Sequence, residues 1–148
     1  MANKIGADCK AYYGTVALAG TPDTGAWNLI NNMRDLRLPV SVGEAEMNTR
    51  GGNSGWEAIV PTLLKGEITF EMLWDTADAA FTKLQTAFLA KAELAFAAMD
   101  GPIATKGSQG LAGNFYVTNF ERNEPLQEGV KVSVTLKCSS RTAWYTVA

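Results

Sequence analysis

The chain of 148 residues contains no histidine. Histidine is the usual general base of Ser-His and Cys-His catalytic sites and the commonest protein ligand of transition metals, so both kinds of site are excluded in their ordinary form. Its two cysteines, Cys9 and Cys138, do not form a cluster that could hold a metal. We expect free thiols packed as small apolar side chains, and a disulfide between them stays open.

An excess of positive charge is also absent, because 13 Lys and Arg stand against 15 Asp and Glu and the net charge is −2. Proteins that grip nucleic acid through its phosphates need a basic face. No apolar run approaches the ~20 residues of a membrane span, and residues 1–10 lack the apolar segment of a secretory signal. The composition, 47% hydrophobic and 19% charged, is that of a globular protein, and we expect one domain over residues 1–148.

Alternation of apolar and polar residues dominates the chain and predicts β-strands with one buried face. The alternating or apolar segments are 5–13, 36–42, 57–64, 67–74, 103–106, 111–121 and 130–139. Pro39 cannot donate to a strand ladder, so the second segment is expected at an edge or a bulge. Lys65-Gly66 separates two apolar runs and predicts the turn of a β-hairpin. Cys9 and Cys138 both fall on the apolar faces of predicted strands.

One segment has the period of a helix. From Thr76 the apolar residues recur every three or four positions, which predicts an amphipathic helix over about 76–91 with Asp75 or Thr76 as its N-cap. Residues 90–98 are rich in alanine and could continue the helix, but their alternation also fits a strand. The sequence therefore predicts a mainly β fold with a single helix.

Residues 43–56 show neither period and predict a long polar loop. A loop of this length in a compact domain is uncommon and tends to be functional. Its glycine-rich part, 51–55, lacks the Lys-Ser/Thr pair of a phosphate-binding loop.

The remaining candidates for chemistry favour structural explanations. Two carboxylate pairs are close in sequence, Glu44 with Glu46 and Asp75 with Asp78. We expect the first pair to be solvated and the second to cap the helix, because acid–base catalysis needs carboxylates held in a pocket. The sequence thus predicts no enzyme, no cofactor and no metal site. The four tryptophans (Trp27, Trp56, Trp74 and Trp144) leave open an alternative, a monomeric β-sandwich that binds carbohydrate.

Two long segments, 30–84 and 107–137, resemble the major tail tube proteins of long-tailed bacteriophages with non-contractile tails. The resemblance is carried by Asn48-Thr49-Arg50, Gly55-Trp56 and Leu64-Lys65-Gly66, and by the run Asn119–Pro125 that leads into an alternating strand. It covers roughly residues 26–138.

The resemblance implies a tail-tube-like β-sandwich or barrel with a flanking helix and a long extended loop. It implies a structural virion protein whose hexameric rings stack into the tail tube, the conduit for genome delivery into the host. Its partners would be further copies of itself and the tape measure, tail tip and tail terminator proteins. Genomic DNA would pass through the lumen without specific binding, and no membrane would be involved. The protein would be assembled in the bacterial host cytoplasm and reside in the virion tail. Tubes of contractile or type VI-like injection systems are a near alternative.

Within this family the long loop would order against the next ring. Its polar side chains and its tryptophan are the predicted contacts between subunits: Glu44, Glu46, Asn48, Thr49, Arg50, Asn53 and Trp56. The acidic balance fits a conduit, because a neutral or negative lumen does not retain DNA.

Overall fold

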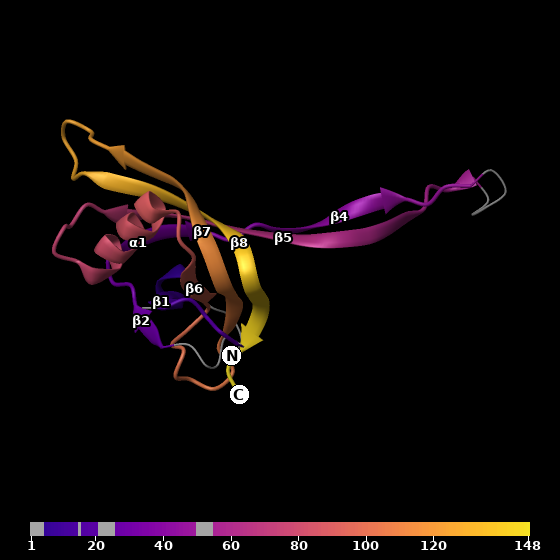
Figure 1. The fold of residues 1–148 in the computed structure, drawn as a ribbon, viewed down its shortest axis with the longest axis horizontal. Coiled ribbons are helices and arrows are strands. Elements are labelled where there is room, and N and C mark those ends of the chain that lie inside the picture. The colour runs from indigo at the N-terminus through magenta and orange to yellow at the C-terminus, as the bar shows by residue number, and fades with distance from the viewer. Residues whose placement is uncertain (1–4, 15, 21–25, 50–54) are drawn as a thin grey trace.

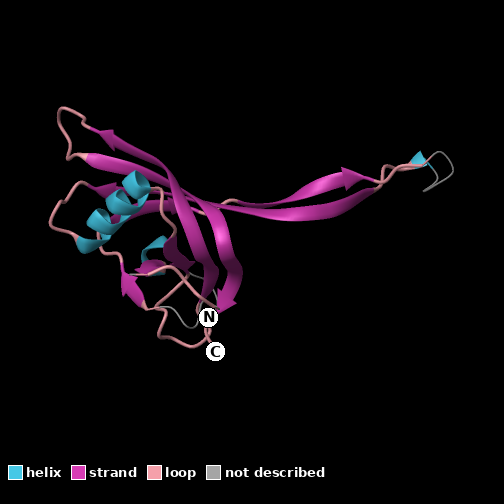
Figure 2. Cartoon of the chain, viewed as in Figure 1, coloured by secondary structure: helices cyan, strands magenta, loops and turns pink. Residues whose placement is uncertain are grey.

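The computed structural model of the chain describes residues 5–14, 16–20, 26–49 and 55–148 (Figure 1). A short 3-10 helix, η1 (Gly6–Asp8), precedes eight strands and one α-helix. The elements are β1 (Lys10–Gly14), β2 (Trp27–Leu29), β3 (Met33–Arg37), β4 (Val40–Glu46), β5 (Ile59–Leu73), α1 (Ala79–Ala90), β6 (Leu94–Met99), β7 (Gln109–Asn123) and β8 (Lys131–Thr146). The prediction of a mainly β fold with one α-helix is confirmed (Figure 2).

All strands pair antiparallel in one curled sheet, in the order β2-β1-β6-β7-β8-β5-β3, and β4 pairs with β5 outside this path. The two edge strands, β2 and β3, are neighbours in sequence, and their short connection spans at most roughly 14 Å. Ile30 N donates to Ala11 O at one edge, and Leu73 N donates to Asn32 O at the other. The connection thus ties the two edges together, so the sheet curls toward a barrel without closing its ladder.

Strand β5 belongs to two parts of the molecule. From Glu67 to Leu73 it pairs with β8, and its other side pairs with β3. From Ile59 to Gly66 it pairs with β4. Together β4 and this part of β5 form a two-stranded hairpin, the arm, which projects away from the body of the sheet (Figure 1).

The core lies between the curled sheet and α1. Apolar side chains of β5 and β8 alternate into it and are buried, including Ile68, Phe70 and Val134. The helix contributes Phe81, whose ring lies 4.8 Å from that of Trp74 and 5.8 Å from that of Phe120, centroid to centroid. Burial of these large apolar side chains is the main force that holds α1 on the sheet.

The helix is shorter than predicted at its start. Asp75 Oδ1 accepts a hydrogen bond from Ala77 N (3.0 Å), which makes a turn before the helix begins after Asp78. The helix ends at Ala90, and the left-handed backbone of Lys91 (φ 56°) lets Ala92 N donate back to Ala87 O (3.1 Å). Residues 94–99 form strand β6, buried on both faces, so the strand alternative for this segment is the correct one.

Two predictions about the strands need correction. Lys65-Gly66 is not a turn, because β5 continues through it from the arm into the body. A Cβ on Gly66 would lie 2.9 Å from Leu111 Cδ2 and 3.2 Å from Cys138 Sγ, so glycine there allows close packing. Residues 103–106 form turns, with Thr105 N donating to Pro102 O, and not a strand.

The other boundaries shift at both ends of the sheet. The predicted strand 5–13 begins with η1, and β1 starts at Lys10. The segment 36–42 is split into β3 and β4 at Pro39, where the ladder is interrupted as its missing N–H requires. Strand β8 continues past 139 to Thr146 and pairs there with the start of β7.

Both cysteines are free and exposed, so the prediction that they pack in the core is wrong. Cys9 follows η1 before the ladder begins, and Cys138 lies where β8 turns away from β5. Among the described helices none is long and apolar enough to cross a membrane.

Candidate assembly surface on the arm

The arm is a regular ladder with one irregularity. Its register runs from Val40 opposite Gly66 to Glu46 opposite Ile59, with a shift between Val42 and Glu44. Its far end is fastened by two hydrogen bonds: Met47 N donates to Ala58 O (3.0 Å), and Ala58 N donates to Asn48 Oδ1 (2.6 Å). The arm is therefore a formed β-hairpin for most of its length, where the sequence predicted a loop over 43–56.

The structure places the predicted contact residues along the outer half of the arm. Glu44 and Glu46 are exposed on β4, and Thr49 is exposed beyond it. Asn48 serves the hairpin itself through its bond to Ala58. Trp56 is 78% exposed near the tip. Arg50 and Asn53 lie outside the described residues.

Large apolar side chains are exposed along the arm to an unusual degree. Half of the exposed large hydrophobic residues of the described structure belong to the arm and the residues at its far end: Val40, Val42, Met47, Trp56, Ile59, Val60, Leu63 and Leu64. A lone two-stranded hairpin is only marginally stable in water, and contiguous apolar exposure marks an interaction surface. The arm therefore has the surface of an element that is covered in an assembly.

The apolar surface continues the buried face of the body. Gly66 and Ile68 are on the face of β5 that points into the core, and Leu64 is the next residue on that face. Val40 and Val42 lie opposite Gly66 and Leu64 and share that face. The core-facing side of the sheet thus runs out of the body onto the arm, where no element of the described chain covers it.

The described part of the arm and its root carry charges of opposite sign. Beyond Ser41 on β4 and before Leu64 on β5, the described charged side chains are the carboxylates of Glu44, Glu46 and Glu57. At the root, Lys65 and Lys137 supply positive charge on adjacent strands.

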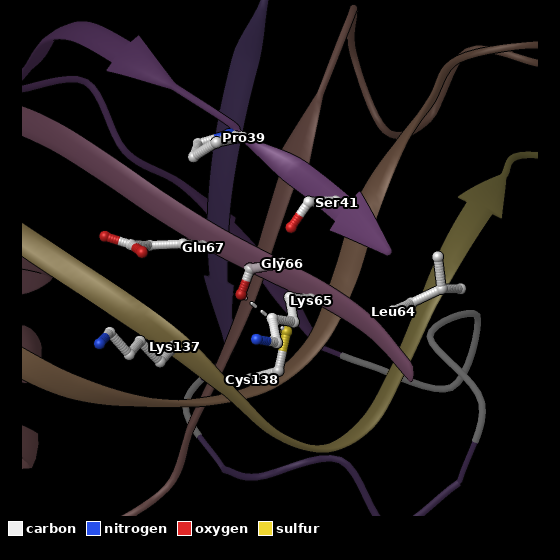
Figure 3. A pocket seen from close by; sticks show the side chains of 8 residues that line it. All are labelled: Pro39, Ser41, Leu64, Lys65, Gly66, Glu67, Lys137 and Cys138. Carbon is white, nitrogen blue, oxygen red and sulfur yellow. Dashed lines mark hydrogen bonds between the residues drawn. The ribbon is translucent and has the colours of Figure 1, made fainter. Parts of the chain in front are cut away.

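A groove of about 410 Å³ lies at this root, where β8 leaves β5 (Figure 3). Its walls come from the start of the arm, from the middle of β5 and from the kink of β8: Pro39, Ser41, Leu64, Lys65, Gly66, Glu67, Lys137 and Cys138. The thiol of Cys138 donates to Gly66 O (3.1 Å), which joins the two diverging strands. No sequence signal could have found this groove, because its residues come from strands some seventy positions apart.

Other candidate sites are dispersed by the fold. Trp74 packs against Phe81 and Arg122, and Trp144 Nε1 donates a hydrogen bond to Gln109 Oε1. Trp56 lies three residues before β5, near the arm tip. None of the four tryptophans lines the root groove or a second groove of about 550 Å³ between β1 and β3. Within the described ranges, no three Cys, Asp or Glu side chains gather in a group that could hold a metal ion.

No protein-family model and no curated protein sequence matches the chain. Solved structures do. The tail of an empty gene transfer agent (GTA) particle, refined with C6 symmetry, matches with a TM-score of 0.76 at 11% identity, over 97% of this chain and 100% of the other. The chain has the tail-tube fold.

Two further solved structures share this fold. The tail tube of SPP1 matches with a TM-score of 0.72 at 15% identity, over 91% of this chain and 75% of the other. A sheath–tube complex of the extracellular contractile injection system PVC matches with a TM-score of 0.66 at 10% identity, over 99% and 93%. The tail-tube-like fold class expected from the sequence is thereby confirmed.

Proposed function

We propose that the chain is a structural subunit of a phage tail tube, and that its copies form rings that stack into a hollow tube. One observation carries this proposal: a hairpin arm projects from the body and exposes an apolar face that its own chain leaves uncovered. The likeness in fold to proteins of assembled tubes supports the same conclusion. The role is mechanical, and no catalytic step is part of it.

The ring would hold six copies, the symmetry with which the gene transfer agent tail was refined. A contact between two different surfaces of neighbouring subunits closes a ring when it is repeated by rotation. A contact repeated along an axis gives a filament. Residues 1–148 would act as one unit in this assembly. Because the net charge is −2, DNA would pass through the lumen without being held by phosphate contacts.

The outer half of the arm would make the contact between successive rings. Its predicted contributors remain those named from the sequence: Glu44, Glu46, Asn48, Thr49, Arg50, Asn53 and Trp56. We place the protein in the virion tail after assembly in the host cytoplasm. There it would meet the tape measure, tail tip and tail terminator proteins.

The test is negative-stain electron microscopy at high protein concentration, beside size-exclusion chromatography at low concentration. The full chain is expected to form rings or hollow tubes. A variant with residues 47–57 replaced by Asn-Gly is expected to fold and to remain unassembled, because the body is built without the arm tip. Leu126→Ser is the control and is expected to assemble: it removes an apolar side chain that is 99% exposed, more than any described on the arm, from the turn between β7 and β8.

Two outcomes would contradict the proposal in different ways. A full-length chain that stays a compact monomer at every concentration, also in the presence of a tail-tip complex, contradicts the tube function. If the chain with the shortened arm forms tubes of normal length, only the role of the arm in assembly is contradicted.

A further inference from the structure

We propose that the groove at the root of the arm is the seat for the arm of a second copy of this chain. In this contact Lys65 and Lys137 of one copy face Glu44 and Glu46 of the next. The inference rests on the proposed function and names the surface that the arm binds.

The groove is open because two strands separate there. The pair of Glu67 with Lys137 is the last one between β5 and β8, and β8 then continues against β7 alone. Beyond this point the described ladder of β5 has a partner on one side only, β4. Such a free strand edge accepts an extended segment from another chain. Leu64 adds an apolar wall that is 78% exposed.

The charges of the groove match those of the arm. Lys65 and Lys137 outnumber the single acidic wall residue, Glu67, whereas the described outer arm carries Glu44, Glu46 and Glu57. Complementary charges across a contact set its register and exclude wrong pairings.

An arm that occupies the groove must come from another copy. Glu44 lies opposite Pro61, which is five residues along β5 from Gly66, roughly 16 Å at the rise of a strand. The arm is held straight by its own ladder and cannot fold back on its root. Because the arm and the groove are different surfaces of one chain, the contact is head-to-tail and repeats from copy to copy.

A thiol inside the groove reports on its occupant. Cys138 is exposed in the subunit and lines the groove. In a Cys9→Ser chain it is the sole cysteine, since the sequence contains two. An arm seated in the groove would slow its reaction with a maleimide by about tenfold or more in assembled protein compared with unassembled protein, because the reagent needs access to the thiol.

Disulfide trapping tests the contact directly. In the Cys9→Ser chain, Glu46→Cys is expected to give a ladder of covalent multimers on a non-reducing gel after mild oxidation. A disulfide needs Cα atoms within about 7 Å, which the two positions of one chain do not reach. Adding Cys138→Ser removes the ladder. Thr105→Cys, an exposed position in a turn of the body, is the matched control and gives no ladder.

Charge exchange tests the pairing without cysteines. The groove variant Lys65→Glu/Lys137→Glu and the arm variant Glu44→Lys/Glu46→Lys are each expected to lose assembly, because like charges then meet. A mixture of the two is expected to assemble, since each groove then meets an arm of opposite charge. Recovery in the mixture shows that both variants fold.

The outcomes separate the two proposals. Tubes in which Cys138 reacts as fast as in the free subunit, and in which Glu46→Cys gives no ladder, overturn the groove contact and leave the tube function standing. Assembly by each charge variant alone also overturns the groove contact. A protein that never assembles and never cross-links overturns both.

Discussion

Asn114 is a buried polar side chain that links separate segments of the body. It is buried in β7, and its amide makes three hydrogen bonds. Its Oδ1 accepts from Leu18 N (2.7 Å), and its Nδ2 donates to Leu18 O (3.0 Å) and to Ser140 Oγ (3.2 Å). This single residue joins the segment before β2 to the kink of β8.

Replacement of Asn114 by Ala is expected to lower the free energy of unfolding by about 2–4 kcal/mol, because the buried backbone groups of Leu18 lose their partners. Urea unfolding followed by fluorescence measures this change. Asn119→Ala, at an exposed position of the same strand, should stay within about 0.5 kcal/mol of the parent. Equal stability of the two variants would show that the Asn114 bonds do not matter.

Glu128 offers a second prediction at the level of a residue. The hydrogen bond from Lys131 Nζ to its Oε2 (3.0 Å), followed by the charge of Lys131, holds the pKa of Glu128 below its ordinary 4.5. A lowered folded-state pKa means that this pair stabilises the protein above the pKa of the unfolded chain. That stabilisation is lost as the pH falls through the folded pKa. The effect of this ion pair on the free energy of unfolding is small because both side chains are partly exposed to solvent.

Lys131→Met is therefore expected to raise the pKa of Glu128 toward 4.5, as measured by an NMR titration of its carboxyl carbon. Arg34→Met should raise the pKa of Glu128 less, because Arg34 is the weaker of the two positive charges that lower it. An unchanged titration in Lys131→Met would refute the assignment of cause.

At the scale of elements, α1 is held by aromatic contacts more than by its caps. Asp78 at its start makes no side-chain capping bond. Phe81 is fully buried between Trp74 and Phe120, and Phe88 stacks on Phe120 at 5.7 Å. The helix is thus held by side chains from β7 and from Trp74, the residue that follows β5.

Phe81→Ala is expected to cost about 3–5 kcal/mol of stability, because it removes a large buried ring and leaves a cavity. Hydrogen exchange should show the amides of α1 losing protection before those of β7. Thr86→Ala, on the exposed side of the same helix, is the control. If α1 kept its protection in Phe81→Ala, the aromatic contacts would not be what holds it.

The arm shows how far sequence can define an element. The alternating segment 36–42 and the apolar run 57–64 placed a strand on each side of the arm, but residues 43–46, predicted as part of a loop, extend β4. The prediction of a turn at Lys65-Gly66 was wrong. A glycine between two apolar runs looks the same in sequence whether the chain reverses there or continues past a closely packed neighbour. Contact with Leu111 and Cys138, which are remote in sequence, decides between the two.

At the scale of the whole molecule, stability is expected to depend on assembly. A subunit that binds its neighbours in the folded state is stabilised by mass action. The melting temperature of the full chain should therefore rise with protein concentration, in step with the appearance of tubes. Differential scanning calorimetry measures this rise.

The chain with the shortened arm should melt at one temperature at all concentrations. The dependence of stability on assembly would be contradicted if a full-length sample rich in tubes had no higher melting temperature than a dilute sample.

Taken by itself, the sequence determined the local period of each segment: strands where apolar and polar residues alternate, one helix where they recur every three or four, and no histidine-based chemistry. These features depend on neighbours along the chain. Tertiary structure alone decided that β5 serves both body and arm, that the two sheet edges meet through three residues, and that both cysteines face outward. It also decided that Lys65, Lys137 and Cys138 share one groove. Such features depend on which strands lie side by side. The alternation of apolar and polar residues along a strand does not identify its neighbours, because it is the same whichever strands pair.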